Sequence, residues 1–177
     1  MTARTVASRL RWAVEMLAVG PDDRVLEVGC GHGVAVTAIC ERLVGGRVIA
    51  IDRSAALIAR AERRNRWHVA AGRALFRATT LAEADFGGAR FDKIFAVNVG
   101  LFWRQPAREL DLIGRLLRPG GTLSLFHQPP SWPQAGAPQG FADALASILR
   151  DAGFSVERVA VQEGEAVPTA CVIAKLA

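Results

Sequence analysis

Short apolar runs alternate with longer segments of helical periodicity along the chain. The runs fall at 24–28, 47–51, 74–78, 91–98 and 122–127. Runs of this length and composition are typical of strands buried on both faces of a sheet. Apolar positions at helical spacing mark the segments 3–19, 33–44, 54–66, 105–118 and 139–151. Because parallel strands need a crossover between them, this alternation predicts a doubly wound α/β fold: a mostly parallel sheet with helices on both faces.

Turn-forming residues separate these segments. Ser54 is placed to cap the helix 54–66, and Pro119 with the two glycines after it is expected to form the turn before the strand 122–127. Two further apolar runs, 155–161 and 169–175, are joined by the turn-rich stretch QEGEAVP and are predicted to pair as a hairpin.

Length and composition favour one domain over residues 1–177, in which the N-terminal helix within 1–20 is a possible lid. The chain is 51% apolar and its mean hydropathy is +0.21, so a sizeable core is expected. No apolar run reaches the ~18 to 20 residues that span a bilayer. Three arginines and Glu15 interrupt the N-terminal segment, so no signal peptide is expected and we predict a cytoplasmic protein.

The net charge is +5 and the pI about 10.0, a balance that also occurs in nucleic-acid-binding proteins. The densest basic cluster consists of Arg60, Arg63, Arg64 and Arg66. Its spacing is typical of a solvated helix face. Nucleic acid therefore stays an open but less favoured partner.

The cysteines are Cys30, Cys40 and Cys171, an odd number spread widely along the chain. They form no CxxC pair and no cluster with histidine. We expect reduced, mostly buried thiols, without a disulfide or a structural metal.

A glycine-rich loop follows the first strand in VLEVGCGHGVA (25–35). Glycines at 29, 31 and 33 allow backbone to approach a ligand closely. Asp52 ends the second strand nineteen residues after Gly33, where its carboxylate could accept hydrogen bonds from both hydroxyls of a ribose. Because ligands of such sheets bind at the carboxyl ends of the strands, the two features together predict a site for a nucleoside cofactor.

Two common nucleotide motifs do not fit this loop. The dinucleotide pattern GxGxxG/A fails, because its sixth position is Val34 when counted from Gly29 and Val36 when counted from Gly31. No GxxxxGK[ST] loop is found either. Glu27 would repel a pyrophosphate but would attract the ammonium group of a methionine moiety.

The loop and the second strand end, EVGCGHG (27–33) and ID (51–52), resemble the class I S-adenosylmethionine-dependent methyltransferases. FDKIFAVNV (91–99) and LLRPGGTLSLF (116–126) are similar to later motifs of that family. The resemblance covers roughly residues 20–130. It implies a seven-stranded sheet with an antiparallel C-terminal strand, S-adenosylmethionine as the cofactor, and methyl transfer to an acceptor.

The resemblance also implies a set of cofactor-binding residues. The glycine loop would admit the methionine portion, Glu27 would support that end, and Asp52 would hold the ribose. The implied set is Glu27, Gly29, Cys30, Gly31, His32, Gly33, Asp52, Arg53, Ser54, Thr79, Thr80, Asn98 and Val99. Thr79 and Thr80 depart from the family, in which many members carry an acid there for the adenine amino group. A threonine hydroxyl can accept that bond, less strongly than a carboxylate.

The sequence assigns no catalytic residue. A sulfonium methyl is already activated, so the enzyme chiefly has to hold a nucleophile in line with it. His127, at the end of the fifth strand, is placed to act as a base for a protonated nucleophile; a surface or hydrogen-bonding histidine is the alternative.

Aromatic residues after the fourth and fifth strands could wall an acceptor pocket. Candidates are Phe102, Trp103 and Trp132, and core packing is the alternative for each; Trp12 and Met16 are better explained as core. We expect a small-molecule acceptor. A nucleic-acid (RNA) methyltransferase and a cofactor-binding protein without transferase activity remain as alternatives.

Overall fold

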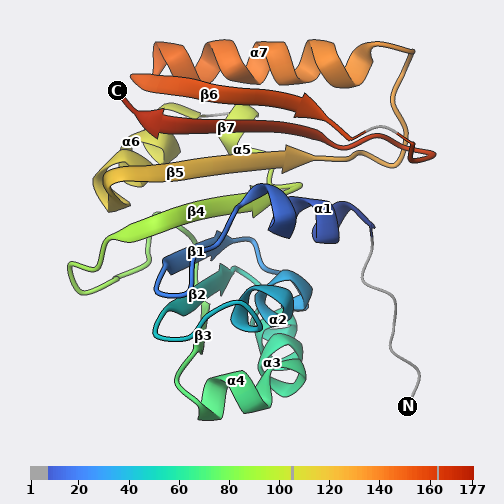
Figure 1. The fold of residues 1–177 in the computed structure, drawn as a ribbon. Helices are drawn as coiled ribbons and strands as arrows, with labels where there is room; N and C mark the ends of the chain where they lie inside the picture. The colour runs from blue at the N-terminus through green and yellow to red at the C-terminus, as the bar shows by residue number, and fades with distance from the viewer. Residues whose placement is uncertain (1–7, 105, 163) are drawn as a thin grey trace.

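The protein is a seven-stranded sheet with helices on both faces (Figure 1), in a computed structural model that describes residues 8–104, 106–162 and 164–177. The strand order is β3-β2-β1-β4-β5-β7-β6. The strands are β1 (Arg24–Val28), β2 (Arg47–Asp52), β3 (Ala74–Ala78), β4 (Phe91–Val97), β5 (Leu117–His127), β6 (Phe154–Val161) and β7 (Ala170–Leu176). The first five pair in parallel, and β7 lies antiparallel between β5 and β6. The predicted fold class and the C-terminal hairpin are confirmed.

Helices cover the two faces of the sheet in separate groups. They are α1 (Ser8–Met16), α2 (Val34–Cys40), α3 (Ala55–Arg64), α4 (Arg66–Ala70), α5 (Leu101–Arg104), α6 (Pro106–Leu116) and α7 (Ala137–Asp151). The core cluster on one face draws on α1, α2 and α3, and the cluster on the other draws on α5, α6 and α7. Within β1, Leu26 and Val28 join one cluster and Val25 joins the other. The alternation follows from the period of two in a strand.

The largest difference between the predicted and the observed element boundaries lies at the PGG turn, residues 119–121. Helix α6 ends at Leu116, two residues earlier than predicted, and β5 already begins at Leu117, which pairs with Phe91. The register then shifts before Lys93 meets Thr122, so the proline and the two glycines form an irregular stretch inside the strand. Pairing with β4 overrides the local turn signal, as in a β-bulge.

Other boundaries differ by less. Ser54 caps α3 as predicted, its hydroxyl accepting from the amide of Leu57 at 3.3 Å. The expected helix 54–66 ends at Arg64, and α4 follows as a separate turn that the periodicity did not predict. The short α5 was also missed. Residues 3–7 and 105 of the predicted helices lie outside the described residues.

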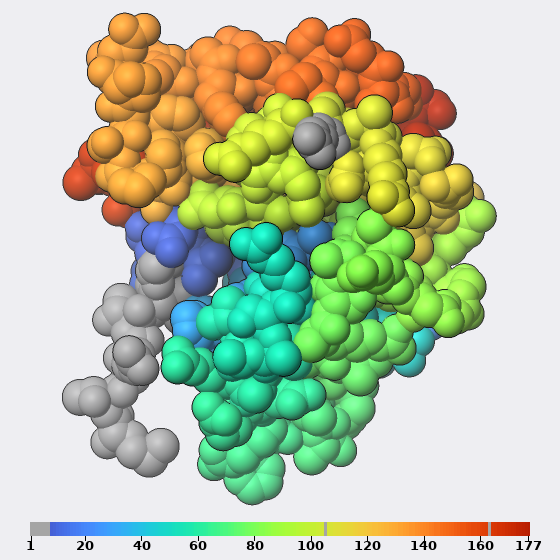
Figure 2. All heavy atoms as spheres, turned by 180° about the vertical axis from the view of Figure 1, so that it is seen from behind, coloured from blue at the N-terminus to red at the C-terminus, as the bar shows by residue number. Residues whose placement is uncertain are grey.

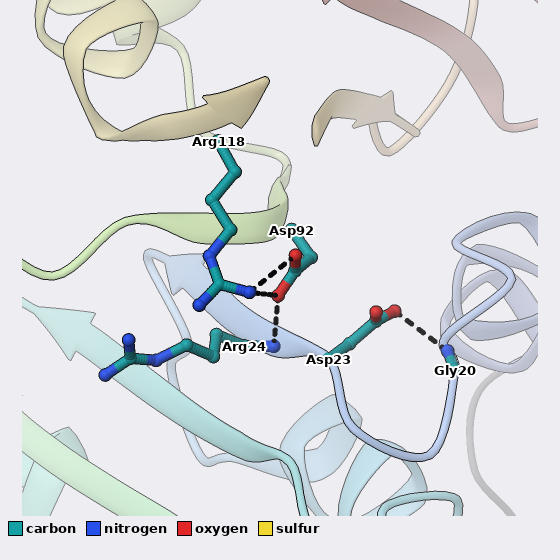
Figure 3. Close-up of polar contacts among 5 residues, drawn as sticks. All are labelled: Gly20, Asp23, Arg24, Asp92 and Arg118. Carbon is teal, nitrogen blue, oxygen red and sulfur yellow. Dashed lines mark hydrogen bonds and ion pairs between the residues drawn. The ribbon is translucent and has the colours of Figure 1, made fainter. Parts of the chain in front are cut away.

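One carboxylate ties three strands together at the amino edge of the parallel sheet (Figure 3). Asp92 accepts the backbone N–H of Arg24 at 2.8 Å and both its oxygens lie 2.9 to 3.0 Å from Nη1 of Arg118. In the turn before β1, Asp23 accepts the N–H of Gly20 at 2.8 Å. These bonds fix the amino ends of β1, β4 and β5. The loops at the opposite, carboxyl edge of the sheet remain available for a ligand site.

Helix α1 packs against the sheet through its apolar side. Trp12 lies edge-on to Phe126 with ring centroids 5.9 Å apart, and Met16 packs partly buried against the same core cluster. The core interpretation of both residues is confirmed. Arg9 of this helix donates to Gln128, just after β5, at 3.2 Å. No helix in the described ranges is both long and apolar enough to cross a bilayer.

Candidate functional site

A cavity of about 530 Å³ opens at the carboxyl ends of the first four strands. Its lining residues are Val28, Gly29, Ile51, Asp52, Arg53, Thr79, Thr80, Leu81, Val97, Asn98, Val99, Gly100, Leu101 and Arg104. In Figure 2 the turquoise, green and yellow-green segments after β2, β3 and β4 meet on one face of the molecule. A larger hollow of about 700 Å³ lies between α6 and α7, toward the opposite edge of the sheet. The smaller cavity is the one at the strand ends where ligands of such sheets bind.

The three glycines of the loop are required for different structural reasons. All have positive φ, at 76°, 53° and 68°. A Cβ on Gly29 would lie 2.5 Å from the Val99 side chain, and one on Gly33 would lie 2.9 Å from Ala61. A Cβ on Gly31 would meet nothing within 4 Å. Gly29 and Gly33 are therefore needed for the packing of the protein itself, whereas Gly31 faces open space that a ligand could fill.

Asn65, which the sequence did not single out, holds the end of this loop. It is buried, with 1% of its surface exposed. Its Nδ2 donates to the carbonyls of Gly33 at 3.0 Å and Ala61 at 2.9 Å, and its Oδ1 accepts from the Thr37 hydroxyl at 2.8 Å. An asparagine within a basic helical segment was the available signal, and it predicts a helix end rather than a loop anchor.

Asp52 fastens the glycine loop to the end of β2. Its Oδ2 accepts the N–H of Gly31 at 3.0 Å, and its Oδ1 accepts the N–H of Ser54 at 2.9 Å. A carboxylate has about four lone-pair sites, so two remain for a ligand in the cavity that Asp52 lines. Ser54 itself is absent from the lining, since its hydroxyl caps α3.

Glu27 lies buried on β1, with 3% of its surface exposed. It pairs in register with Ala50 on one side and Phe95 on the other. Burial, and after it the nearby Asp52 carboxylate, raises the pKa of Glu27 to about 8. Its Oε2 has no hydrogen-bond partner, and no ion pair with Glu27 is found among the residues that the structure describes. A cation bound above the loop would favour the ionised carboxylate.

Thr79 and Thr80 line the cavity after β3. The Thr80 hydroxyl donates to the Glu83 carboxylate at 2.7 Å, and the Thr79 hydroxyl donates to the Thr80 carbonyl at 3.3 Å. The lone pairs of both hydroxyls remain free to accept from an amino group. The Glu83 carboxylate is thereby held beside Thr80.

The residues after β4 line the other end of the cavity. Asn98 has a positive φ of 59°, and its Oδ1 accepts the N–H of Gln128 at 2.7 Å. With Val99 it lines the cavity. Phe102 does not, because it is fully buried in the core. Its neighbour Trp103 instead packs against His127.

His127 lies in an aromatic cluster. Its ring centroid is 4.7 Å from that of Trp103, 5.5 Å from Trp132 and 4.6 Å from Phe141. Burial, and after it the charge of Arg104, lowers the pKa of His127. Its Nδ1 is buried and has no hydrogen-bond partner within the described part of the chain. The imidazole is therefore neutral near pH 7 and able to accept a proton.

Six residues of the implied set do not line the main cavity: Glu27, Cys30, Gly31, His32, Gly33 and Ser54. His32 lines a separate hollow of about 410 Å³ with Val34, Arg60 and Arg64, and its carbonyl accepts from Nε of Arg64 at 3.1 Å. Cys30 is buried, as are the other two cysteines, which confirms the expected burial of the thiols.

The site has the features that S-adenosylmethionine requires. Its volume is within the usual range for small-ligand sites, roughly 300–1,000 Å³. Asp52 keeps free lone pairs for a ribose, Gly31 leaves open space, and the buried Glu27 carboxylate has an oxygen without a partner. A ligand with a sugar and a cationic end fits these groups.

Comparisons with known proteins agree with this geometry. The family described as "Methyltransferase domain" matches residues 25–121. An uncharacterized methyltransferase of Synechocystis, sll0829, is 28% identical over 163 residues, which cover 82% of this chain and 73% of that protein. The O-methyltransferase cnsE of Penicillium expansum is 29% identical over 171 residues, which cover 88% of this chain and 60% of that protein.

Solved structures share the fold at lower identity. A SAM-dependent methyltransferase from Aquifex aeolicus superimposes with a TM-score of 0.76 at 18% identity, over 95% of this chain and 89% of that one. Geranyl diphosphate methyltransferase in complex with SAM gives 0.74 at 15%, over 96% and 85%. The family match covers more than half of the chain, including the glycine loop and Asp52. The chain therefore belongs to the methyltransferase-domain family, the class I S-adenosylmethionine-dependent methyltransferases that its loop motifs resemble.

Proposed function

We propose that this protein is an enzyme that transfers the methyl group of S-adenosylmethionine to a small-molecule acceptor. The observation that carries the proposal is the bond between Asp52 and the N–H of Gly31, which holds the open glycine position next to a carboxylate that lines the cavity. Small acceptors are also found among structural neighbours, since geranyl diphosphate methyltransferase was solved with its substrate GPP and sinefungin.

Different residues along this edge of the sheet are assigned to different parts of the cofactor. Asp52 accepts hydrogen bonds from the ribose, and the hydroxyls of Thr79 and Thr80 accept from the adenine amino group. Glu27 stabilises the ammonium of the methionine end. When bound, S-adenosylmethionine supplies an activated methyl group. The protein then has to orient the acceptor, exclude water and, for a protonated nucleophile, hold the proton at His127.

Calorimetric titration tests the proposal. Purified protein is titrated with S-adenosylmethionine, S-adenosylhomocysteine and NAD. We expect binding of the first two in the micromolar range and none of NAD. If S-adenosylmethionine binds but no acceptor in a broad screen is methylated, the alternative of a cofactor-binding protein without transferase activity takes precedence. Binding of NAD alone would refute the proposal.

Asp52→Ala is expected to weaken binding of S-adenosylhomocysteine by a few kcal/mol. Each hydrogen bond to a charged group contributes ~1.5 to 3 kcal/mol, and the glycine loop also loses its attachment to β2. Calorimetry measures the change. Asp111→Ala, on the exposed face of α6, serves as the control because Asp111 pairs only with Arg115 at the surface. Unchanged affinity in Asp52→Ala would show that Asp52 is not the ribose ligand.

His127→Ala is expected to slow methyl transfer by roughly 10²-fold or more, with little effect on cofactor affinity. Because the pKa of His127 is lowered from its ordinary value, the imidazole loses its ability to accept a proton only at acidic pH. The wild-type rate should therefore fall on acidification, and the variant should lack this limb of the pH profile. Initial rates with an acceptor from the screen check both. An equal loss of rate and cofactor affinity would indicate a structural residue.

One observation supports the nucleic-acid alternative. Trp67 on α4 is 72% exposed, and the guanidinium of Arg66 lies 5.1 Å from the centre of its ring. Exposed aromatic and basic side chains together can stack on and neutralise a nucleic acid. Binding to RNA that falls steeply with salt, and is lost in Trp67→Ala, would favour this acceptor class.

A further inference from the structure

The residues that line the cavity follow one another along the edge of the sheet. Thr79 follows β3, Asp52 ends β2, Gly29 follows β1 and Asn98 follows β4. Since the sheet order is β3-β2-β1-β4-β5, the proposed cofactor runs from the adenine at β3 to the methionine at β1 and β4. The acceptor would then lie at the β4 side of the cavity, which Gly100, Leu101 and Arg104 line.

We infer that Arg104 anchors an anionic group of the acceptor, a carboxylate or a phosphate. The inference rests on the proposed function, because it concerns the acceptor side of the same site. Arg104 ends α5, directly after β4, and lines the cavity. Its side chain folds back along this helix, with Nε 3.3 Å from the position of a Cβ built on Gly100. The guanidinium therefore lies beside Gly100, which also lines the cavity.

Arg104 is free to take a ligand. Its side chain is exposed, and among the described residues it forms no ion pair and donates no side-chain hydrogen bond. Some other arginines in the described ranges are already engaged: for example, Arg118 pairs with Asp92, and Arg64 donates to a backbone carbonyl. A guanidinium presents paired N–H groups that match a carboxylate or a phosphate in a bidentate arrangement.

The charge of the site favours an anion. The charged residues that line the cavity are Asp52, Arg53 and Arg104. Asp52 already accepts two backbone N–H groups and is assigned to the ribose. The sulfonium of the cofactor adds a further positive charge, so a cationic acceptor would be repelled and an anionic one attracted.

The neighbours of Arg104 indicate the rest of the acceptor. Trp103 precedes it, and the ring of Trp103 packs against His127. Arg104 also lies close enough to His127 for its charge to act on the imidazole. An acceptor held by Arg104 through its anionic group would place its remaining, apolar or aromatic body beside these rings. The acceptor class is a small anionic molecule with an apolar or aromatic body that carries the nucleophile.

The test uses the full-length protein saturated with S-adenosylhomocysteine and three probes. 4-Hydroxybenzoate and 4-hydroxybenzamide have the same shape but differ in charge, and inorganic phosphate represents the other anion. Calorimetry gives the affinities, and the ring signals of His127 in NMR spectra report binding near Arg104. Arg104→Gln removes the charge, Arg104→Lys keeps it without the fork, and Arg108→Gln alters an exposed arginine of α6 that does not line the cavity.

We expect at least one anion to bind and to shift the His127 signals. If the anionic group of the acceptor is a carboxylate, 4-hydroxybenzoate should bind more tightly than 4-hydroxybenzamide. If that group is a phosphate, inorganic phosphate should bind most tightly. Arg104→Gln should lower the affinity for that anion by about tenfold or more, Arg104→Lys by less, and Arg108→Gln not at all. Affinity for S-adenosylhomocysteine should stay the same in Arg108→Gln, which lies outside the cavity.

The inference is overturned if neither anion binds the wild type at concentrations of tens of millimolar. It is also overturned if Arg104→Gln binds the anion with the same affinity as the wild type. A wild type that does not bind S-adenosylhomocysteine refutes the proposed function instead. In that event the same anions, titrated into the free protein and its variants, still decide whether Arg104 is an anion site.

Discussion

Replacing Glu27 by glutamine is expected to stabilise the free protein at alkaline pH. The pKa of Glu27 is raised to about 8 in the folded state, from 4.5. The folded state therefore holds this proton more tightly than the unfolded state, and stability is lost as the pH rises from about 4.5 to about 8. Each pKa unit corresponds to about 1.4 kcal/mol, so the ionised carboxylate costs several kcal/mol. Glutamine is neutral throughout and lacks this cost.

The measurement is the free energy of unfolding by urea at pH 5 and at pH 9, for wild type and variant. The advantage of Glu27→Gln should be small at pH 5 and several kcal/mol at pH 9. Glu62→Gln, on the exposed side of α3, is the matched control and should show no such difference. Equal curves for wild type and Glu27→Gln would mean that Glu27 is not held protonated by burial.

The same variant is expected to lose cofactor affinity. A cofactor ammonium stabilises the ionised carboxylate, so binding at pH 7 should release a proton from Glu27 in the wild type. Calorimetry in two buffers of different ionisation enthalpy measures this release, which Glu27→Gln should abolish. A residue that destabilises the free protein and strengthens its complex is typical of a binding site.

Gly31→Val is expected to weaken S-adenosylmethionine binding by about a hundredfold or more while the protein still folds. A Cβ at position 31 meets no protein atom within 4 Å, and the backbone N–H of this residue donates to Asp52, so a valine side chain would compete with a ligand bound there. The positive φ of 53° makes the substitution cost about 1–3 kcal/mol of stability. Calorimetry measures the affinity, and circular dichroism with thermal unfolding measures the fold and its stability.

Gly72→Val separates these two effects. Gly72 has a positive φ of 70° and equally open surroundings, but it lies in the turn between α4 and β3. It should lose a similar amount of stability and keep its affinity. Gly33→Val, by contrast, should fail to fold, because its side chain would overlap Asn65 and Ala61. If Gly31→Val binds like the wild type, the loop does not contact the cofactor.

The fold class follows from the sequence because its signals are local. Buried strands correspond to short apolar runs, and crossover helices have a helical period of apolar residues. Ser54 marks the start of a helix through a bond to a residue three positions later. The pairing of Asp52 with the glycine loop is predictable for the same reason. Parallel neighbouring strands end at the same edge, so residues that end them must meet.

Tertiary contacts decided the features that depend on distant parts of the chain. The residues 119–121 carry the local signs of a turn, yet they lie inside β5, between Leu117 and Thr122, which both pair with β4. Phe102 and Trp103 are adjacent aromatic residues, and only the orientation of the four-residue α5 places the first in the core and the second beside His127. A helix of one turn has no periodicity from which that orientation could be predicted.

The chemistry of individual groups was decided in the same way. The sequence by itself determined that an acid would stand at position 27 and glycines at 29, 31 and 33. The raised pKa of Glu27, the open space at Gly31 and the exposed guanidinium of Arg104 depend on what surrounds each group. Burial and electrostatic fields sum over neighbours from the whole fold, whereas periodicity and turn preferences act within a few residues.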